Sequence, residues 1–154
     1  MKTQKLLLIG CGLCAVLGAI GLALLIGGFV YLSQDPEGLS VTLQQPAVVE
    51  RGREFTLTVS VVNERERKSL KIDNIDLSED YLKGFTVISY DPPCQSSYVS
   101  LGTRTFEYDA TIGPGESNLF TFTLKPLRKG RYTGDVDVYE GWLFLTQVAD
   151  TVVE

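Results

Sequence analysis

Residues 55–63 read FTLTVSVVN, and this stretch decides the fold class of the chain. Apolar side chains alternate with hydroxyl-bearing ones from Phe55 to Val61. Such alternation is typical of a β-strand with one buried face, because successive side chains of a strand point to opposite sides. The same pattern returns at residues 106–112 and 120–124. The sequence therefore predicts a protein built from half-buried strands.

Further strand patterns lie on both sides of this stretch, at residues 41–43, 70–72, 85–90, 132–139 and 142–153. Clusters of glycine, proline and charged residues separate the runs at short intervals, as turns do. Strands so spaced predict an all-β fold of about seven or eight strands, arranged as two antiparallel sheets packed face to face. No run in this region indicates a long helix.

One of these runs changes its phase. Between Ile72 and Ile75 the apolar pattern slips by one residue. In a regular strand such a slip sends the following side chains to the other face of the sheet. We expect a bulge or a turn at Asp73 and Asn74 to absorb it.

An unbroken apolar run precedes the strand region. Residues 6–32 hold no charged side chain and no Asn, Gln, Ser, Thr or Pro. A helix of ~20 such residues crosses the ~30 Å hydrocarbon core of a bilayer. The sequence predicts a cytoplasmic tail at residues 1–5, a transmembrane anchor at 6–32, a linker at 33–38 and an extracytoplasmic domain at 39–154.

Charge sets the expected orientation of this anchor. Lys2 and Lys5 stand before the run, and residues 33–38 hold no basic side chain. Because flanking Lys and Arg stay on the cytoplasmic side, we expect a single-pass signal-anchor in the cytoplasmic membrane, with its N-terminus inside and its C-terminal domain outside. Two alternatives stay open, a cleaved signal peptide and lipidation at Cys11 after Leu8-Ile9-Gly10. The length of the run favours the anchor.

Three patterns inside the run resemble chemical or packing motifs. Gly10-x-Gly12-x-x-Ala15 imitates a dinucleotide-binding turn, but a helix that is apolar on every face is better explained as a membrane span. Cys11 and Cys14 have redox or zinc spacing, yet the chain has no histidine to complete a zinc site. Small residues repeat every four positions on one helix face, either as ordinary membrane-helix composition or as a surface that packs against itself or a partner helix. The two stripes are Ala15, Ala19, Ala23 and Gly27, and Gly10, Cys14 and Gly18.

The charge balance after the run excludes one class of partner. Of 14 basic residues, two precede the run, while all 19 acidic residues follow it, so this part carries a net charge of −7. Nucleic-acid binding needs the opposite sign. We expect no nucleic-acid partner, and we expect the domain to stand off an anionic headgroup surface.

The absence of histidine from all 154 residues argues against an enzyme. It removes the commonest general base and any Ser-His or Cys-His nucleophile. We expect no catalytic residue, no cofactor and no metal; an enzyme would require a cleft with paired carboxylates of perturbed pKa. Asp135 and Asp137 share one strand face and could give oxygens to calcium, but a solvated sheet surface is the favoured interpretation.

Two features mark a candidate contact surface. Cys94 is the one cysteine after the apolar run, so it is either a buried inert thiol or an exposed thiol that bridges two chains. Trp142 follows Glu140-Gly141 at a predicted hairpin tip, with Tyr139 and Phe144 nearby. This aromatic group either caps one end of the core, which we favour, or forms an exposed platform for a protein or a sugar.

The order of these patterns resembles a known family. The matching elements are Val41-x-Leu43, Gly52, the alternating residues 55–63, Gly113-Pro114-Gly115-Glu116, Phe120-x-Phe122-x-Leu124 and Gly130-x-Tyr132. Together they resemble bacterial and archaeal immunoglobulin-like modules of the CARDB type, which are related to cell adhesion. The resemblance implies an immunoglobulin-like β-sandwich with an interaction role. The region departs from antibody-like domains in having no Cys-Trp-Cys framework, and it holds one such unit where these modules usually come in tandem.

These observations lead to one expected function and one alternative. We expect a non-enzymatic, membrane-anchored extracytoplasmic interaction module, an accessory subunit of an envelope complex. Its expected partners are the lipid bilayer and a membrane or envelope protein, which includes a second copy of the chain. The alternative is a β-sandwich that binds a small ligand or a glycan near Trp142.

Overall fold

The computed structural model describes residues 20–25, 27–28 and 35–154. The chain divides into two compact units, Met1–Gln34 and Asp35–Glu154. In the first unit residues 20–25 and 27–28 are helical and exposed. No helix among the described residues has both the length and the apolar content needed to cross a bilayer. Most of the predicted anchor lies outside the described residues, as do Cys11 and all the stripe residues except Ala23 and Gly27.

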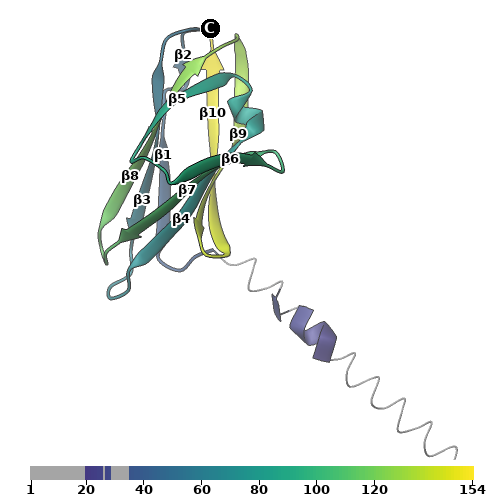
Figure 1. Cartoon of the computed structure of the whole chain (residues 1–154), viewed down its shortest axis with the longest axis vertical. Helices are drawn as coiled ribbons and strands as arrows, with labels where there is room; N and C mark the ends of the chain where they lie inside the picture. Colours follow the sequence, from purple (N-terminus) through teal and green to yellow (C-terminus); the bar gives the residue numbers. More distant parts are fainter. Residues whose placement is uncertain (1–19, 26, 29–34) are drawn as a thin grey trace, which may run out of the picture. The chain divides into compact units, whose positions relative to one another are not determined.

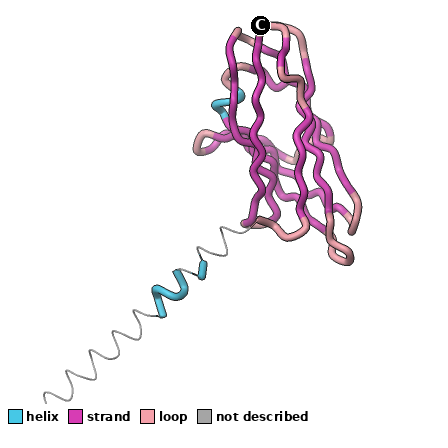
Figure 2. Tube along the Cα trace, turned by 180° about the vertical axis from the view of Figure 1, so that it is seen from behind, coloured by secondary structure: helices cyan, strands magenta, loops and turns pink. Residues whose placement is uncertain are grey.

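The second unit is a β-sandwich (Figure 1), and its described residues form ten strands. The four-stranded sheet has the order β1-β3-β8-β5, and the six-stranded sheet has the order β2-β10-β9-β4-β7-β6. Neighbouring strands pair antiparallel, except that β2 pairs parallel with β10. Figure 2 shows the two layers from behind. The strands are β1 (Leu39–Gln44), β2 (Val48–Val49), β3 (Phe55–Asn63), β4 (Leu70–Ser78), β5 (Phe85–Asp91), β6 (Ser96–Ser100), β7 (Thr103–Ile112), β8 (Ser117–Pro126), β9 (Gly130–Glu140) and β10 (Leu143–Val153).

All eight predicted strand runs are confirmed, and β2 and β6 are additional. The stretch 55–63 is β3, and the side chains of Leu57, Val59 and Val61 are fully buried. Aromatic rings join the two sheets across this core. The ring centroids of Phe106 and Phe122 lie 4.8 Å apart, and those of Tyr108 and Phe120 lie equally close. Burial of each such side chain contributes about 1.5–3 kcal/mol relative to exposure.

The bulge or turn that the sequence predicts at Asp73 and Asn74 is a bulge in β4. The register between β4 and β7 shifts between Ile72 and Asn74. Ile72 before the shift and Ile75 after it are therefore both fully buried, although they are three residues apart. The bulge also fixes which β4 side chains face outward, because Asn74 and Asp76 alternate with the buried positions that follow it.

A four-residue helix, α2 (Glu79–Leu82), connects β4 to β5. The side chain of Ser78 caps it by accepting a hydrogen bond from the Asp80 amide at 3.2 Å. Tyr81 of this helix is fully buried, and its hydroxyl lies 3.0 Å from the Thr151 hydroxyl. The helix therefore seals one edge of the core.

Asn63, the last residue of β3, holds two loops together. Its side chain is fully buried. The Nδ2 group donates to the carbonyls of Lys68 and Ile112, both at 2.9 Å, and to that of Gly113 at 3.0 Å. Its Oδ1 accepts from the Arg65 amide at 3.1 Å. The β3–β4 loop and the β7–β8 turn are thus joined through one side chain.

Candidate binding face on the six-stranded sheet

The hairpin of β9 and β10 displays an exposed indole ring. Gly141 has a φ of 63°, a left-handed conformation that favours glycine, and its amide donates to Asp73 Oδ2 at 2.6 Å. The turn places the Trp142 side chain in solvent with 85% of its surface exposed. The expectation that Trp142 caps the core is therefore wrong, because the turn geometry directs the ring away from the sandwich.

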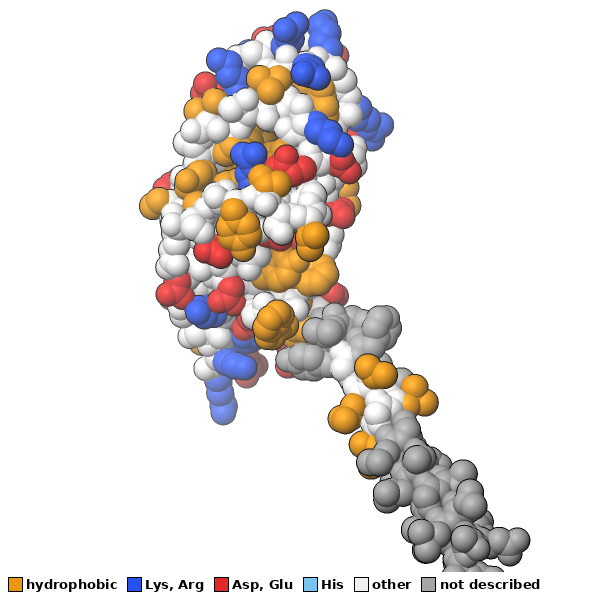
Figure 3. All heavy atoms as spheres, turned by 45° about the vertical axis from the view of Figure 1, so that its right-hand side comes forward, with side chains coloured by type: hydrophobic (Ala, Val, Ile, Leu, Met, Phe, Trp, Pro, Cys, Tyr) orange, Lys and Arg blue, Asp and Glu red, His pale blue; other side chains and the backbone are white. Residues whose placement is uncertain are grey.

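Trp142 forms part of a groove that crosses the outer face of the six-stranded sheet. The groove has a volume of about 590 Å³ and is open to solvent. Figure 3 turns forward the side of the domain that carries β6 and α2 in Figure 1, and apolar side chains stand there among acidic and basic ones. The lining residues are Asn74, Asp76, Tyr98, Ser100, Leu101, Thr103, Thr105, Tyr139 and Trp142.

The groove collects its side chains from strands that the bulge and the hairpins bring together. Asn74 and Asp76 of β4 lie between Tyr139 of β9 and Thr105 of β7. Tyr98 belongs to β6, which pairs with β7 at the edge of the sheet. Short polar side chains therefore form the middle of the groove, and aromatic ones lie toward its two sides.

The Asp76 carboxylate retains hydrogen-bonding capacity on the groove side. Asp76 is 9% exposed and accepts one hydrogen bond, from Asn74 Nδ2 to its Oδ1 at 3.0 Å. No donor among the residues that the structure describes reaches its second carboxylate oxygen. A carboxylate that is largely desolvated forms strong hydrogen bonds with hydroxyl and amide donors.

The outer face is electrostatically negative around this carboxylate. Asp137 lies directly opposite Asp76 on β9. Burial raises the pKa of Asp137, and the charges of Asp135 and Asp76 add to this, although the hydroxyl of Thr146, 2.5 Å away, works in the other direction. Burial and the charges of Asp76 and Asp137 also raise the pKa of Tyr139.

This geometry bears on two further predictions, a calcium site at Asp135 and Asp137 and a contact role for Cys94. Asp135 and Asp137 both face outward, but within the described part of the chain no cluster of three or more His, Cys, Asp or Glu is arranged to hold a metal ion. Cys94 is partly exposed, packs against the core and does not line the groove. Its thiol raises the pKa of the exposed Tyr90 hydroxyl.

The predicted contact residues are brought together only in part. Tyr139 and Trp142 line the groove, and Phe144 packs beside Tyr139 with ring centroids 5.0 Å apart. The opposite side of the groove was not predicted. Tyr98 lies in β6, and Leu101, which is fully exposed, follows it in a turn with a φ of 49°. The strand-forming pair Tyr98-Val99, followed after Ser100 by Leu101-Gly102, is the signal that could have revealed this hairpin.

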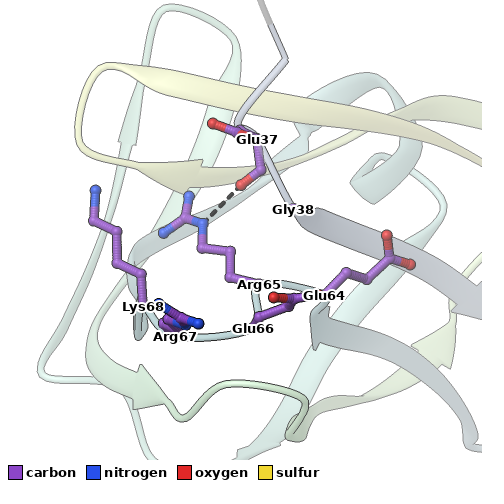
Figure 4. Close-up of a pocket in the computed structure, with 7 residues that line it drawn as sticks. All are labelled: Glu37, Gly38, Glu64, Arg65, Glu66, Arg67 and Lys68. Carbon is purple, nitrogen blue, oxygen red and sulfur yellow. Dashed lines mark hydrogen bonds between the residues drawn. The ribbon is translucent and has the colours of Figure 1, made fainter.

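A second hollow lies where the chain enters β1 (Figure 4). Its volume is about 610 Å³, and its central side chain, Arg65, is already engaged. The guanidinium donates to Glu140 at 2.7 and 2.5 Å, to the Glu37 carbonyl at 2.7 Å and to the Ser69 carbonyl at 3.2 Å. Hydrogen bonding to Glu140 raises the pKa of Arg65. The hollow is a structural clamp, and the lining residues are Glu37, Gly38, Glu64, Arg65, Glu66, Arg67 and Lys68.

Comparison with known proteins concerns the fold. No protein-family model and no curated protein matches the chain. Among solved structures the chain is similar to the CARDB domain of a Pyrococcus furiosus protein in complex with di-metal ions, at 18% identity over 80% of this chain and 96% of that chain, with a TM-score of 0.48. It is also similar to a cohesin module from a Clostridium perfringens family 33 glycoside hydrolase, at 12% identity over 75% of this chain and 96% of that chain, with a TM-score of 0.50. A CARDB domain, the kind of module that the sequence resembles, is thus among the similar solved structures. The fold itself, a four-stranded sheet packed on a six-stranded one, is a β-sandwich.

Proposed function

We propose that the protein is a non-enzymatic, membrane-anchored binding module that acts outside the cytoplasm through the outer face of its six-stranded sheet. The observation that carries this proposal is Trp142, which is 85% exposed at the side of the groove. A large aromatic side chain left in solvent beside a concave surface is typical of a contact site, since aromatic residues are enriched where proteins bind partners.

The anchor part of the proposal rests on the apolar run. Residues 6–32 are long enough to span a bilayer, and Lys2 and Lys5 favour an inside location for the N-terminus. Residues 33–38 would then reach at most ~20 Å at ~3.3–3.6 Å per residue, so any partner lies in or near the membrane.

The proposed module has two binding surfaces, one on the helix and one on the domain. The small-residue stripes would pack against a helix of an envelope protein or of a second copy of this chain, which would make the protein an accessory subunit of an envelope complex. The groove would bind outside the bilayer. Catalysis is not part of the proposal, because Asp137, the carboxylate opposite Asp76, does not line the groove and is hydrogen-bonded to Thr146.

The test compares what co-purifies with four forms of the full chain from cross-linked cells. These are the wild type, a chain whose residues 6–32 are replaced by an unrelated anchor, the Tyr98→Ala/Trp142→Ala double variant, and Val148→Ala. Val148 is the matched control, because it is 60% exposed on β10 but does not line the groove.

Each of the two proposed binding surfaces, the helix and the groove, predicts which variant loses a co-purifying partner. A partner lost with the exchanged anchor belongs to the helix, and a partner lost with the double variant but kept by Val148→Ala belongs to the groove. The groove assignment fails when the double variant keeps every partner of the wild type. The anchor fails when alkaline carbonate strips the full chain from membranes.

A further inference from the structure

We propose that the groove binds an uncharged glycan segment, with Trp142 and Tyr98 as stacking platforms and Asp76 as the acceptor of sugar hydroxyl hydrogen bonds. This inference rests on the proposed function, because it names the ligand class of the same face. The arguments come from the groove's aromatic sides, its polar middle and its charge.

The aromatic sides suit sugar rings. One face of a pyranose carries mostly C–H groups, and it gains contact area and dispersion energy on a flat aromatic surface. Trp142 stands on one side of the groove, and Tyr98, 49% exposed, lines the other. Tyr139 pairs with Phe144, and the neighbouring Trp142 ring stays 85% exposed. The two exposed rings are therefore separate platforms across an open groove.

The polar middle suits hydroxyl groups, which both donate and accept hydrogen bonds. Asn74 and the hydroxyls of Ser100 and Thr105 supply donors and acceptors, and Asp76 supplies the unused carboxylate oxygen. The Thr103 hydroxyl donates to the Ser100 carbonyl at 3.0 Å and so offers a ligand an acceptor. A small organic cation would pair with only the acceptors among these groups, and the donors would have no hydrogen-bond partner on the ligand. A pure hydrocarbon ligand would leave all of them unpaired, which is costly. A polyhydroxylated ligand satisfies both kinds of group.

The charge of the face excludes acidic polymers. No basic side chain of the described chain lines the groove, and Asp76, Asp135 and Asp137 lie close together on neighbouring strands. A phosphorylated or carboxylated glycan would be repelled by them. The volume of about 590 Å³ falls in the ~300–1,000 Å³ range of small-ligand sites. The occupant is therefore a short stretch of neutral sugar units.

The experiment uses the single tryptophan of the chain as its reporter. The full chain in mild detergent is titrated with three neutral hexasaccharides, cellohexaose, chitohexaose and mannohexaose, while Trp142 emission is recorded. Two charged probes, hexagalacturonate and octa-arginine, are titrated in parallel. We expect at least one neutral hexasaccharide to shift the emission and saturate, and the hexagalacturonate to have no effect.

Variants locate the binding in the groove. Tyr98→Ala and Asp76→Asn retain the reporter and should each weaken the neutral sugar about tenfold, since each removes one stacking or charge-assisted contact. Val148→Ala should bind like the wild type. Circular dichroism of each variant checks that it is folded, and Asp76→Asn keeps the shape of the side chain.

Two results would overturn the glycan assignment. Octa-arginine saturating the groove while every neutral sugar fails up to 10 mM would mark it as a site for basic peptides. Failure of all the probes at that limit would also reject the neutral-glycan class. In either case the binding-module proposal stands if the Tyr98→Ala/Trp142→Ala chain loses a cellular partner, and it fails separately if no partner is lost.

Discussion

Replacing Asn63 with aspartate tests how the fold holds its loops, because Asn63→Asp changes one NH₂ group to an oxygen with almost no change in shape. The NH₂ group has two protons for three carbonyl acceptors at 2.9–3.0 Å. Loss of these hydrogen bonds costs about 2–3 kcal/mol at about 1 kcal/mol each. Holding a carboxyl group among carbonyl oxygens in a fully buried site adds about 2 kcal/mol. We expect a total loss of about 4–5 kcal/mol, a large part of the 5–15 kcal/mol typical of a domain.

Urea unfolding of the full chain, followed by far-UV circular dichroism at several pH values, measures this loss. The buried carboxyl should have a folded-state pKa above its unfolded value of ~3.9, so the variant should regain stability as the pH falls toward 4 and lose it as the pH rises. Asn118→Asp is the control, because Asn118 is only half-buried and uses its Oδ1 oxygen, which aspartate retains. A loss for Asn63→Asp below 1 kcal/mol, or one equal to that of Asn118→Asp, would refute the reasoning.

Three further predictions concern ionisable groups. Arg65→Met should destabilise the chain by about 3 kcal/mol in thermal unfolding, because it leaves the largely buried Glu140 carboxylate, 22% exposed, without its partner. The loss should be smaller when Glu140→Gln is present, and additive losses would disprove the coupling. Burial raises the pKa of Tyr81 to about 12, so the stability that this group contributes should be complete below pH 10 and should disappear as the pH rises through 12. Tyr81→Phe should remove this alkaline component of the urea midpoint while costing about 1 kcal/mol at pH 7, and an unchanged alkaline slope would contradict it. Asp137→Asn should stabilise the chain by about 0.5 kcal/mol at pH 7, since it removes like charge opposite Asp76. This gain should vanish below pH 3.8, because the pKa of Asp137 is raised above that value in the folded state, and a gain that persists in acid would argue for another cause.

The strands were predictable because their pattern is local. The alternation from Phe55 to Val61 needs only one buried face, and the strand extends two residues further to Asn63. The slip between Ile72 and Ile75 was enough to predict the bulge in β4, since a strand with one buried face cannot change phase without an extra residue. These features depend on side-chain period and not on distant partners.

The elements that the sequence analysis did not predict depend on contacts between residues that are distant in the sequence. β2 has two residues and exists because Val48–Val49 pairs with the C-terminal end of β10. α2 is too short to show a helical period, and Tyr81 is buried by packing against Phe85 and Thr151. The exposure of Trp142 follows from the backbone at Gly141, which the hydrophobicity of the ring does not reveal. The groove could not be predicted, because it requires the bulge, two hairpins and the order of the strands together.

The clamp at Arg65 has a mechanical consequence for a tethered domain. Arg65 follows β3 of the four-stranded sheet, and Glu140 ends β9 of the six-stranded sheet, while the Glu37 carbonyl belongs to the segment that leads into β1. Tension applied through that segment would meet charge-assisted hydrogen bonds before it reached the ladder between β1 and β3. The force would be shared between both sheets, so in the anchored state proposed above a pull on the domain would not peel the first strand from the sandwich.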